Sequence, residues 1–281
     1  MPYKTLITTK ELSHHLAEPG WVVIDCRFDL SDPDWGVGET LKNHIPTAVY
    51  AHLNDDLSDK VTVITGRHPL PDHKTITSKF GTWGISANSQ VVVYDQSDGS
   101  IASRLWWLLR YYGHTQVAVL DGGFQKWVRD DLPLLSVVKF RLPATFHGKP
   151  HPDMVADIDL VKRARLDSTW LVIDSRAPER YLGISETIDP IAGHIPGSVN
   201  YYFGDNLNPG STYKDPIELR QEFNNLLDSR QPDRVIVYCG SGVTSCSNLL
   251  ALQHAGIHGA RLYPGSWSEW IRDPDNPIAT E

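Results

Sequence analysis

The sequence predicts an α/β protein built from two similar halves, each a mostly parallel sheet with helices on both faces. Three observations carry this prediction: short apolar runs alternate with helical stretches, segments of the first half recur in the second, and the chain has 281 residues. Strands that are buried on both faces read as continuous apolar runs, and crossover helices separate them along the chain. A chain of this length is expected to form about two domains.

The elements of the first half can be assigned in order. Thr8 is a suitable N-cap for a short helix, and Pro19 and Gly20 form a turn before the first long strand. Gly113 would end the helix that precedes it. The irregular stretch 53–71 is a loop whose length is typical of a functional segment. The predicted strands and helices of this half are the helix 8–16, the strand 21–27, the strand 90–94 and the helix 101–112.

The internal repeat is visible in four pairs of segments. Residues 21–27 (WVVIDCR) match residues 170–176 (WLVIDSR), and both are apolar strands that end in Asp-x-Arg. The other pairs follow in the same order: 43–49 with 193–199, 90–94 with 234–238, and 120–127 with 262–270. Colinear matches of this kind indicate a duplicated domain.

The boundary between the halves is predicted at a proline-rich stretch. Residues 132–153 contain four prolines and little hydrophobic periodicity, which is typical of a linker. We therefore expect a first domain over 1–140, a linker over 141–153 and a second domain over 154–281.

The composition narrows the class of partner. A formal net charge of −8 and a pI near 5.8 argue against nucleic acid or an anionic membrane as the main partner. No apolar run is long enough for a signal peptide core or a membrane span, and three cysteines are too few for a disulfide framework. The histidines and cysteines show no metal-ligand spacing. We expect a cytoplasmic protein without a metal or another cofactor.

The stretch 235–245 (VIVYCGSGVTS) carries the functional prediction. Its first four residues suit a buried strand, Gly240 and Gly242 allow a tight loop, and a helix follows that Gly256 would end. Cys239 lies at the start of this loop, where backbone N–H groups and the positive end of a helix dipole favour the thiolate. We expect an acidic, exposed thiol.

The first half lacks this thiol. When Tyr94 is superposed on Tyr238, Asp95 takes the position of Cys239. Ligands of open α/β sheets bind at the carboxyl ends of strands, where both residues stand. The second half is therefore predicted to be catalytic and the first to be an inactive copy.

Five motifs are informative in combination: the paired Asp-x-Arg strands, the two His-Ile-Pro segments, the helix segment 104–107 (RLWW), the loop 239–244 (CGSGVT) and the closing segment 265–270 (GSWSEW). Together they resemble the tandem-domain sulfurtransferases, the family of rhodanese and 3-mercaptopyruvate sulfurtransferase, over nearly the whole chain. The resemblance implies two rhodanese-like domains and a small-molecule sulfur donor.

The family resemblance also implies a mechanism. The Cys239 thiolate attacks the donor's sulfur, forms a persulfide and releases pyruvate, and a thiol, a thioredoxin-like protein or cyanide accepts the sulfur. Arg180 would bind the donor's carboxylate. Ser241, His68 and Asp55 would form a relay for the proton of the leaving enolate. The remaining donor-binding residues that we predict are Gly240, Gly242, Val243, Thr244 and Arg104.

The choice of donor depends on charges near the loop. No Lys or Arg lies between Cys239 and Thr244, which favours singly charged 3-mercaptopyruvate over doubly charged thiosulfate, the alternative donor. In the mercaptopyruvate branch a second arginine is expected nine residues after Arg180, where Asp189 stands. Either another cation, such as Arg104 or Arg67, replaces it, or the preferred donor differs.

Two other functions and several plainer roles remain open. A phosphatase would need an arginine at the end of a Cys-x5-Arg loop, where Ser245 stands. A binding module without catalysis would not need the cysteine that the second half keeps. The plainer roles are a buried apolar thiol at Cys239, a surface ion pair at Arg180, a solvated side chain at His68, a surface acidic cluster around Asp55 and a loop-shaping hydroxyl at Ser241.

Overall fold

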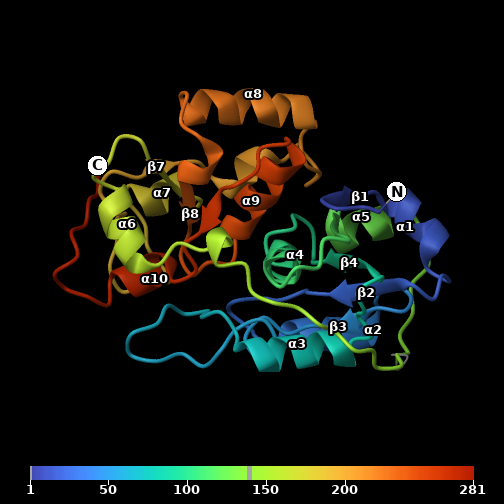
Figure 1. Ribbon diagram of the computed structural model, residues 1–281. Coiled ribbons are helices and arrows are strands. Elements are labelled where there is room, and N and C mark those ends of the chain that lie inside the picture. The colour runs from blue at the N-terminus through green and yellow to red at the C-terminus, as the bar shows by residue number, and fades with distance from the viewer. Residues whose placement is uncertain (1, 138–140) are drawn as a thin grey trace. The chain divides into compact units, whose positions relative to one another are not determined.

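The computed structural model describes residues 2–137 and 141–281, so the predicted domain edge at 140 lies outside the described residues. The chain forms two compact units (Figure 1). The first unit comprises Met1–Asp59, Leu70–His151 and Asn208–Tyr213. The second comprises Lys60–Pro69, Pro152–Leu207 and Lys214–Glu281. The predicted boundaries at 140, 141, 153 and 154 stay a prediction.

The first unit contains a five-stranded sheet in which every pair is parallel, in the order β1-β5-β4-β2-β3. Val23 and Val92 point to one face, and Val22 and Val91 to the other. All four are at most 1% exposed, so both faces of the sheet are covered. The strands are β1 (Leu6–Ile7), β2 (Trp21–Asp25), β3 (Val49–Tyr50), β4 (Gln90–Tyr94) and β5 (Val117–Leu120).

Helices supply that cover. Leu12 of α1 and Trp127 of α5 share a core with Val23 and Val92, while α4 packs against β4 and β5. The predicted cap at Thr8 is confirmed, because its hydroxyl accepts from the Glu11 N–H. The helices of this unit are α1 (Thr9–His15), α2 (Trp35–Lys42), α3 (His73–Thr82), α4 (Ala102–Tyr111) and α5 (Gly123–Arg129).

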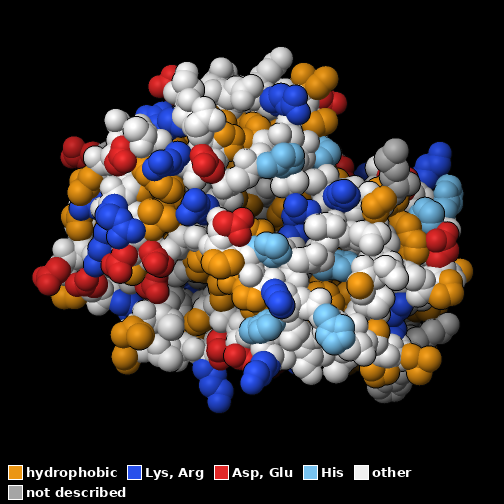
Figure 2. Space-filling view, viewed as in Figure 1, with side chains coloured by type: hydrophobic (Ala, Val, Ile, Leu, Met, Phe, Trp, Pro, Cys, Tyr) orange, Lys and Arg blue, Asp and Glu red, His pale blue; other side chains and the backbone are white. Residues whose placement is uncertain are grey.

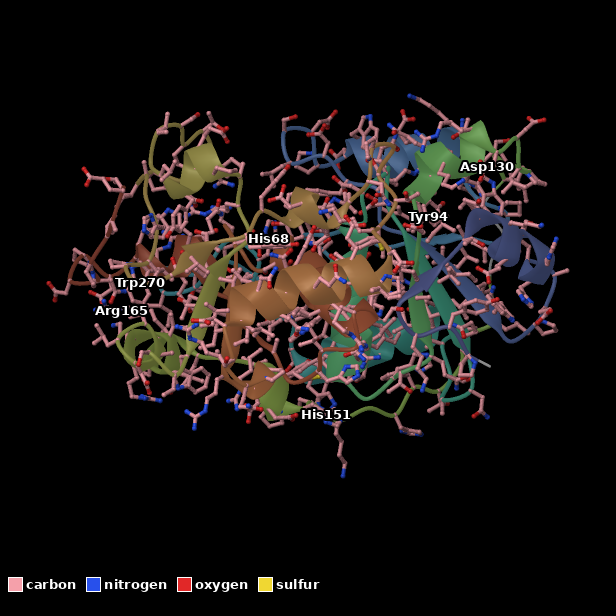
Figure 3. All side chains as sticks on the ribbon, turned by 90° about the horizontal axis from the view of Figure 1, so that it is seen from above. His68, Tyr94, Asp130, His151, Arg165 and Trp270 are labelled. Atoms are coloured by element: carbon pink, nitrogen blue, oxygen red, sulfur yellow. The ribbon has the colours of Figure 1, made fainter. Side chains whose placement is uncertain are left out.

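The second unit repeats the plan with a four-stranded parallel sheet in the order β7-β6-β8-β9. Its core includes Trp267 and Trp270, both fully buried. The Arg165 guanidinium lies 5.9 Å from the Trp270 ring, and Figure 3 shows the two residues side by side. The strands are β6 (Leu171–Asp174), β7 (Val199–Asn200), β8 (Val235–Tyr238) and β9 (Arg261–Leu262).

The helices of the second unit connect these strands and flank them. Short 3-10 turns, which are η1, η2 and η3, stand between the longer elements. The helical elements are η1 (Pro152–Met154), α6 (Ile158–Ala164), α7 (Pro178–Tyr181), η2 (Phe203–Asn206), α8 (Pro216–Leu227), η3 (Pro232–Arg234), α9 (Ser245–His254) and α10 (Ser266–Trp270).

The two Asp-x-Arg motifs end their strands in the same way. We predicted that the strands extend through Arg27 and Arg176, but they end at Asp25 and Asp174. In each case the arginine turns back, because its backbone N–H and its guanidinium both donate to the preceding carboxylate. These buried ion pairs lie at the carboxyl ends of β2 and β6, the end of each sheet from which the functional loops start.

On the face seen in Figure 2, Lys and Arg side chains alternate with Asp and Glu side chains and do not gather into one basic patch. Among the described residues, no helix is long and apolar enough to cross a membrane.

Candidate active site at the Cys239 loop

The Cys239 loop connects the end of β8 to the start of α9, as predicted. The beginning of α10 holds it in place: the Cys239 carbonyl accepts from the Trp267 N–H at 3.0 Å, and the Cys239 N–H donates to the Ser266 hydroxyl at 3.2 Å. Gly242 has a φ of +77°, and a Cβ there would lie 2.4 Å from the Pro264 carbonyl oxygen. Only glycine therefore allows the turn that brings the loop back over the thiol.

The Cys239 thiol is acidic although it is buried. Burial raises its pKa, but hydrogen bonds from the Ser245 and Thr244 hydroxyls and from the Ser241 and Ser245 N–H groups outweigh burial, so the pKa lies below its ordinary value. The residue is 2% exposed. The predicted acidity agrees with this environment, whereas the predicted exposure is wrong because the loop closes around the sulfur.

Ser245 is one of the residues that sequence reasoning used only to exclude a phosphatase. Its hydroxyl is buried and has no other hydrogen-bond partner among the described residues, which leaves it to the Cys239 thiolate. A hydroxyl five or six positions after the cysteine, at the first turn of the following helix, was the available signal.

Ser241 and His68 form a hydrogen-bonded pair in this loop. The His68 Nδ1 lies 2.7 Å from the Ser241 hydroxyl oxygen, and both residues are more than 90% buried. His68 belongs to the segment Lys60–Pro69, which forms part of the second unit, and Figure 3 labels its position. The pair can exchange protons, and its Ser241 follows Cys239 by only two residues in the chain.

The guanidinium groups of Arg67 and Arg180 lie close to Gly240 of this loop. A Cβ built on Gly240 would be 2.8 Å from Arg67 Nη2 and 3.5 Å from Arg180 Nη2. Asp189 is bonded to both guanidinium groups. Of the two cations that we considered as replacements for the missing arginine at 189, the structure thus places Arg67 at the loop.

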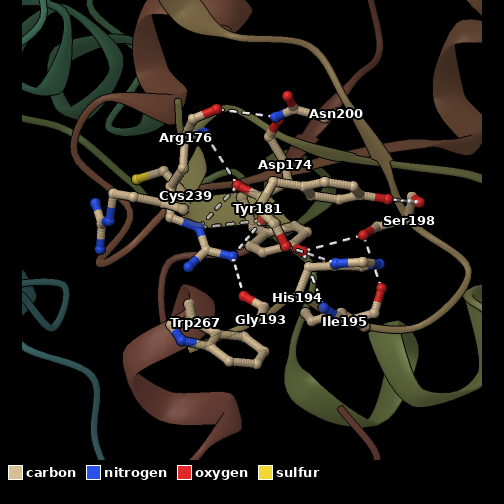
Figure 4. Close-up of polar contacts among 12 residues, drawn as sticks. Asp174, Arg176, Tyr181, Gly193, His194, Ile195, Ser198, Asn200, Cys239 and Trp267 are labelled. Carbon is tan, nitrogen blue, oxygen red and sulfur yellow. Dashed lines mark hydrogen bonds and ion pairs between the residues drawn. The ribbon is translucent and has the colours of Figure 1, made fainter. Parts of the chain in front are cut away.

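A buried framework supports this cluster. The Arg176 guanidinium donates to Asp174 and to the Gly193 carbonyl at 2.6 and 2.7 Å, and lies 5.0 Å from the centre of the Trp267 ring. Figure 4 shows these contacts with Cys239 in the same close-up. Several contacts therefore hold the Arg176 side chain, which follows β6, the strand that pairs with β8.

Two of the predicted site residues belong to the first unit. Asp55 has a side chain that is 81% exposed and lies 3.4 Å from the His52 Nδ1. Arg104 is fully buried in α4, where its Nη2 donates to the Leu57 carbonyl at 3.3 Å. Their roles in a proton relay and in donor binding stay predictions.

The equivalent loop of the first unit surrounds the carboxylate of its own Asp95. Asp95 Oδ1 accepts from the Ser97 and Gly99 N–H groups, and Oδ2 from those of Ile101 and Ala102, at 2.9 to 3.1 Å. Burial raises the pKa of Asp95 to about 6. The loop therefore retains an anion cradle without a nucleophilic sulfur.

The described residues contain no cluster of three or more His, Cys, Asp or Glu side chains that could hold a metal ion. The chemistry that the site offers is that of an activated thiolate next to a Ser-His pair and two arginines.

Comparison with known proteins agrees with this class of fold and site. The family described as rhodanese-like domain matches residues 8–130 and 158–273. A probable 3-mercaptopyruvate sulfurtransferase of Pseudomonas aeruginosa is 43% identical over 277 residues, which cover 98% of each chain. Mouse thiosulfate sulfurtransferase is 33% identical, over 96% of this chain and 93% of the relative.

A solved structure shows the same architecture. The 3-mercaptopyruvate sulfotransferase SseA of Escherichia coli superposes with a TM-score of 0.82 at 31% identity, over 95% of this chain and all of the other. A two-domain fold with a cysteine loop in its second unit defines the class. The chain belongs to the rhodanese family and is a tandem-domain sulfurtransferase. The predicted fold class, family and enzyme class are confirmed.

Proposed function

We propose that this sulfurtransferase takes sulfur from 3-mercaptopyruvate and passes it, through a persulfide on Cys239, to a small thiol, a thioredoxin-like protein or cyanide. The thiolate forms a bond with the donor's thiol sulfur while the carbon–sulfur bond breaks. The electron pair of that bond passes to the pyruvate enolate, which takes up a proton and leaves as pyruvate. The persulfide then remains in the hydrogen-bonding environment that stabilised the thiolate.

The observation that carries this proposal is the 2.7 Å contact between His68 Nδ1 and the Ser241 hydroxyl. An enolate is a strongly basic leaving group and profits from a proton donor, whereas the sulfite that leaves from thiosulfate is a weak base. A Ser-His pair beside the nucleophile is therefore more useful to a mercapto-ketone donor. Asp55 belongs to the proposal as the third member of the relay.

The charges of the loop also support a singly charged donor. No Lys or Arg occurs between Cys239 and Thr244, so the loop offers a doubly charged donor only backbone N–H groups and hydroxyls. The N–H groups of Gly240, Gly242, Val243 and Thr244 are proposed to face the donor, with Arg180 and Arg104 as further contacts. The sparse cysteines support a cytoplasmic location.

Mass spectrometry of the purified enzyme tests the sulfur transfer. After incubation with 3-mercaptopyruvate, we expect the intact chain to gain the mass of one sulfur atom and the solution to gain pyruvate. Cys239→Ser should abolish both. Cys26→Ala is the matched control, because Cys26 is a buried thiol of the first unit, and it should retain both.

A comparison of donors tests the substrate. We expect kcat/KM to be higher for 3-mercaptopyruvate than for thiosulfate. If thiosulfate is the better donor, the enzyme class stands and the proposed donor is wrong. Hydrolysis of an aryl phosphate at a rate that depends on Cys239 would instead restore the phosphatase, despite Ser245 at the position of its arginine.

A further inference from the structure

We propose that Ser266 is a positioning residue for sulfur transfer. Its hydroxyl holds the main chain of Cys239, and the fold keeps a strained backbone at Ser266 in order to place that hydroxyl. This inference rests on the proposed function, in which Cys239 is the nucleophile. Ser266 is the first residue of α10 and acts through Cys239 rather than on the donor.

The backbone of Ser266 has a conformation that serine rarely adopts. Its φ is +55°, in the left-handed region where a side chain crowds the backbone and glycine is favoured. Six of the described residues other than glycine have a positive φ, and Ser266 is the buried one among them. Strained residues persist only where the surrounding structure holds them, and they cluster at functional sites.

The equivalent of Ser266 in the first unit is Gly123. Gly123 has a φ of +57°, and the N–H of the residue that follows it donates to the Asp95 carbonyl at 2.9 Å. The N–H of the residue after Ser266 donates to the Cys239 carbonyl in the same way, at 3.0 Å. A Cβ on Gly123 would lie 2.9 Å from the Asp95 carbonyl oxygen. The two units therefore share this backbone turn, and the unit with the cysteine makes room for a side chain on it.

The hydroxyl of Ser266 is used on both sides. It donates its one proton to the Tyr263 carbonyl at 2.9 Å and accepts the Cys239 N–H at 3.2 Å. The described residues supply no side-chain cap to α10, whose N-cap is Gly265. Helix capping, the ordinary role of a serine at the start of a helix, therefore does not account for this hydroxyl.

Ser266 and Trp267 together hold the main chain on both sides of the nucleophile. The Cys239 N–H is bonded to the Ser266 hydroxyl, and the Cys239 carbonyl accepts from the Trp267 N–H. The hydroxyls that stabilise the thiolate belong to Ser245 and Thr244, further along the loop. A shift of the Cys239 main chain would change the distances from the sulfur to these donors. Small displacements of a reacting group cost much of its rate.

Two substitutions separate the hydroxyl from the strained backbone. Ser266→Ala removes the hydroxyl and keeps the strain, whereas Ser266→Gly removes both, because glycine adopts a positive φ freely. We expect both variants to lower kcat for pyruvate release from 3-mercaptopyruvate by about 10- to 100-fold. In urea unfolding, Ser266→Gly should have the higher midpoint of the two. The variant with the relaxed backbone should thus be more stable than Ser266→Ala and equally slow.

The reactivity of the thiol gives a second readout, which needs no sulfur donor. Alkylation by iodoacetamide, followed on the Cys239 peptide as a function of pH, reports the midpoint of thiolate formation. We expect this midpoint to rise by about 0.5 to 1 pH unit in both variants, as the weakening of roughly one hydrogen bond to the thiolate implies. A residue that only supports the fold would lower the urea midpoint without moving the alkylation midpoint.

Ser229→Gly is the matched control. Ser229 also belongs to the second unit and has a φ of +69°, but it is exposed, in the turn after α8. The substitution relieves the same kind of strain without removing a contact to Cys239. It should leave kcat and the alkylation midpoint at their wild-type values.

The outcomes distinguish this inference from the proposed function. A wild-type kcat and an unchanged alkylation midpoint in Ser266→Gly would overturn the inference, because the hydroxyl would then be dispensable. A loss in Ser266→Ala that is absent from Ser266→Gly would also overturn it, because the backbone alone would matter. If the wild-type enzyme forms no persulfide from 3-mercaptopyruvate, the proposed function fails, while the alkylation midpoints still decide whether Ser266 positions the thiol.

Discussion

The loops that follow β4 and β8 stand at equivalent positions in the two units, and each surrounds a different anionic group. Asp95 and Cys239 both follow the tyrosine that ends a central strand, and both are buried. In the first unit, burial outweighs four backbone N–H bonds and raises the pKa of Asp95 to about 6. In the second, hydroxyls and N–H groups outweigh burial and lower the pKa of Cys239.

The difference between the loops indicates what an acidic thiol requires beyond the fold. Counting from each anion, Ile101 stands in the first unit where Ser245 stands in the second. The first loop therefore lacks a side-chain hydroxyl that the second directs at the sulfur. An anion cradle is a general product of a strand, a tight loop and a helix, whereas an activated sulfur also needs these added donors.

The largest effect is expected when the second loop is given the anion of the first. Cys239→Asp keeps a negative charge in the loop but removes the sulfur, so kcat/KM for 3-mercaptopyruvate should fall by more than about a thousandfold. Pyruvate release measures it. Residual turnover within tenfold of wild type would show that the nucleophile lies elsewhere.

The Ser-His pair beside Cys239 should give the next largest effect. Ser241→Ala removes the hydroxyl that His68 Nδ1 contacts, and we expect kcat for 3-mercaptopyruvate to fall by about 10²- to 10⁴-fold, the usual contribution of a proton donor. With thiosulfate the loss should be much smaller. Equal losses with both donors would contradict a role in protonating an enolate.

The anion of the first unit should affect stability rather than activity. The folded-state pKa of Asp95, about 6, is above the value of about 3.9 expected for an unfolded chain. The folded state therefore holds the proton more tightly, and stability that is present below about pH 4 is lost as the pH rises through 6, by about 3 kcal/mol.

Urea unfolding of wild type and Asp95→Asn at pH 4.5 and 7 measures this, because Asn does not titrate. We expect the urea midpoints at pH 4.5 and pH 7 to differ less in Asp95→Asn than in the wild type. An identical pH dependence in both proteins would show that Asp95 is not the group responsible.

The smallest of these expected effects is that of the Ser245 hydroxyl, which has no counterpart at Ile101 in the first loop, on the pKa of Cys239. Ser245→Ala removes a hydrogen bond to the thiolate, so the pKa of Cys239 should rise and its alkylation by iodoacetamide at neutral pH should slow by about tenfold. The pH dependence of alkylation gives the midpoint directly. Ser247→Ala, two residues further along α9, is the matched control and should leave the midpoint unchanged.

The fold and the position of the Cys239 loop could be predicted because they depend on short segments. Continuous apolar runs predict the parallel strands and the repeat, and the glycines at 240 and 242 predict the loop after β8. The replacement of the cysteine by Asp95 in the first half was equally evident. Local rules of strands, turns and caps are sufficient for such features.

The arrangement around Gly240 could not be predicted in the same way. Arg67 stands in the first half of the sequence, but its segment packs into the second unit, and only that packing brings it to Asp189. The burial of Cys239 likewise depends on how the loop folds back toward Pro264. Contacts between residues far apart in sequence leave no periodic signal in a single chain.

The most direct test of the account locates the transferred sulfur. Wild-type enzyme treated with 3-mercaptopyruvate is digested without reductant, and the peptides that contain Cys26, Cys239 and Cys246 are weighed. We predict one additional sulfur atom per chain, on the Cys239 peptide alone. Sulfur on the Cys26 or Cys246 peptide, or on none of the three, would contradict the assignment of catalysis to the loop after β8.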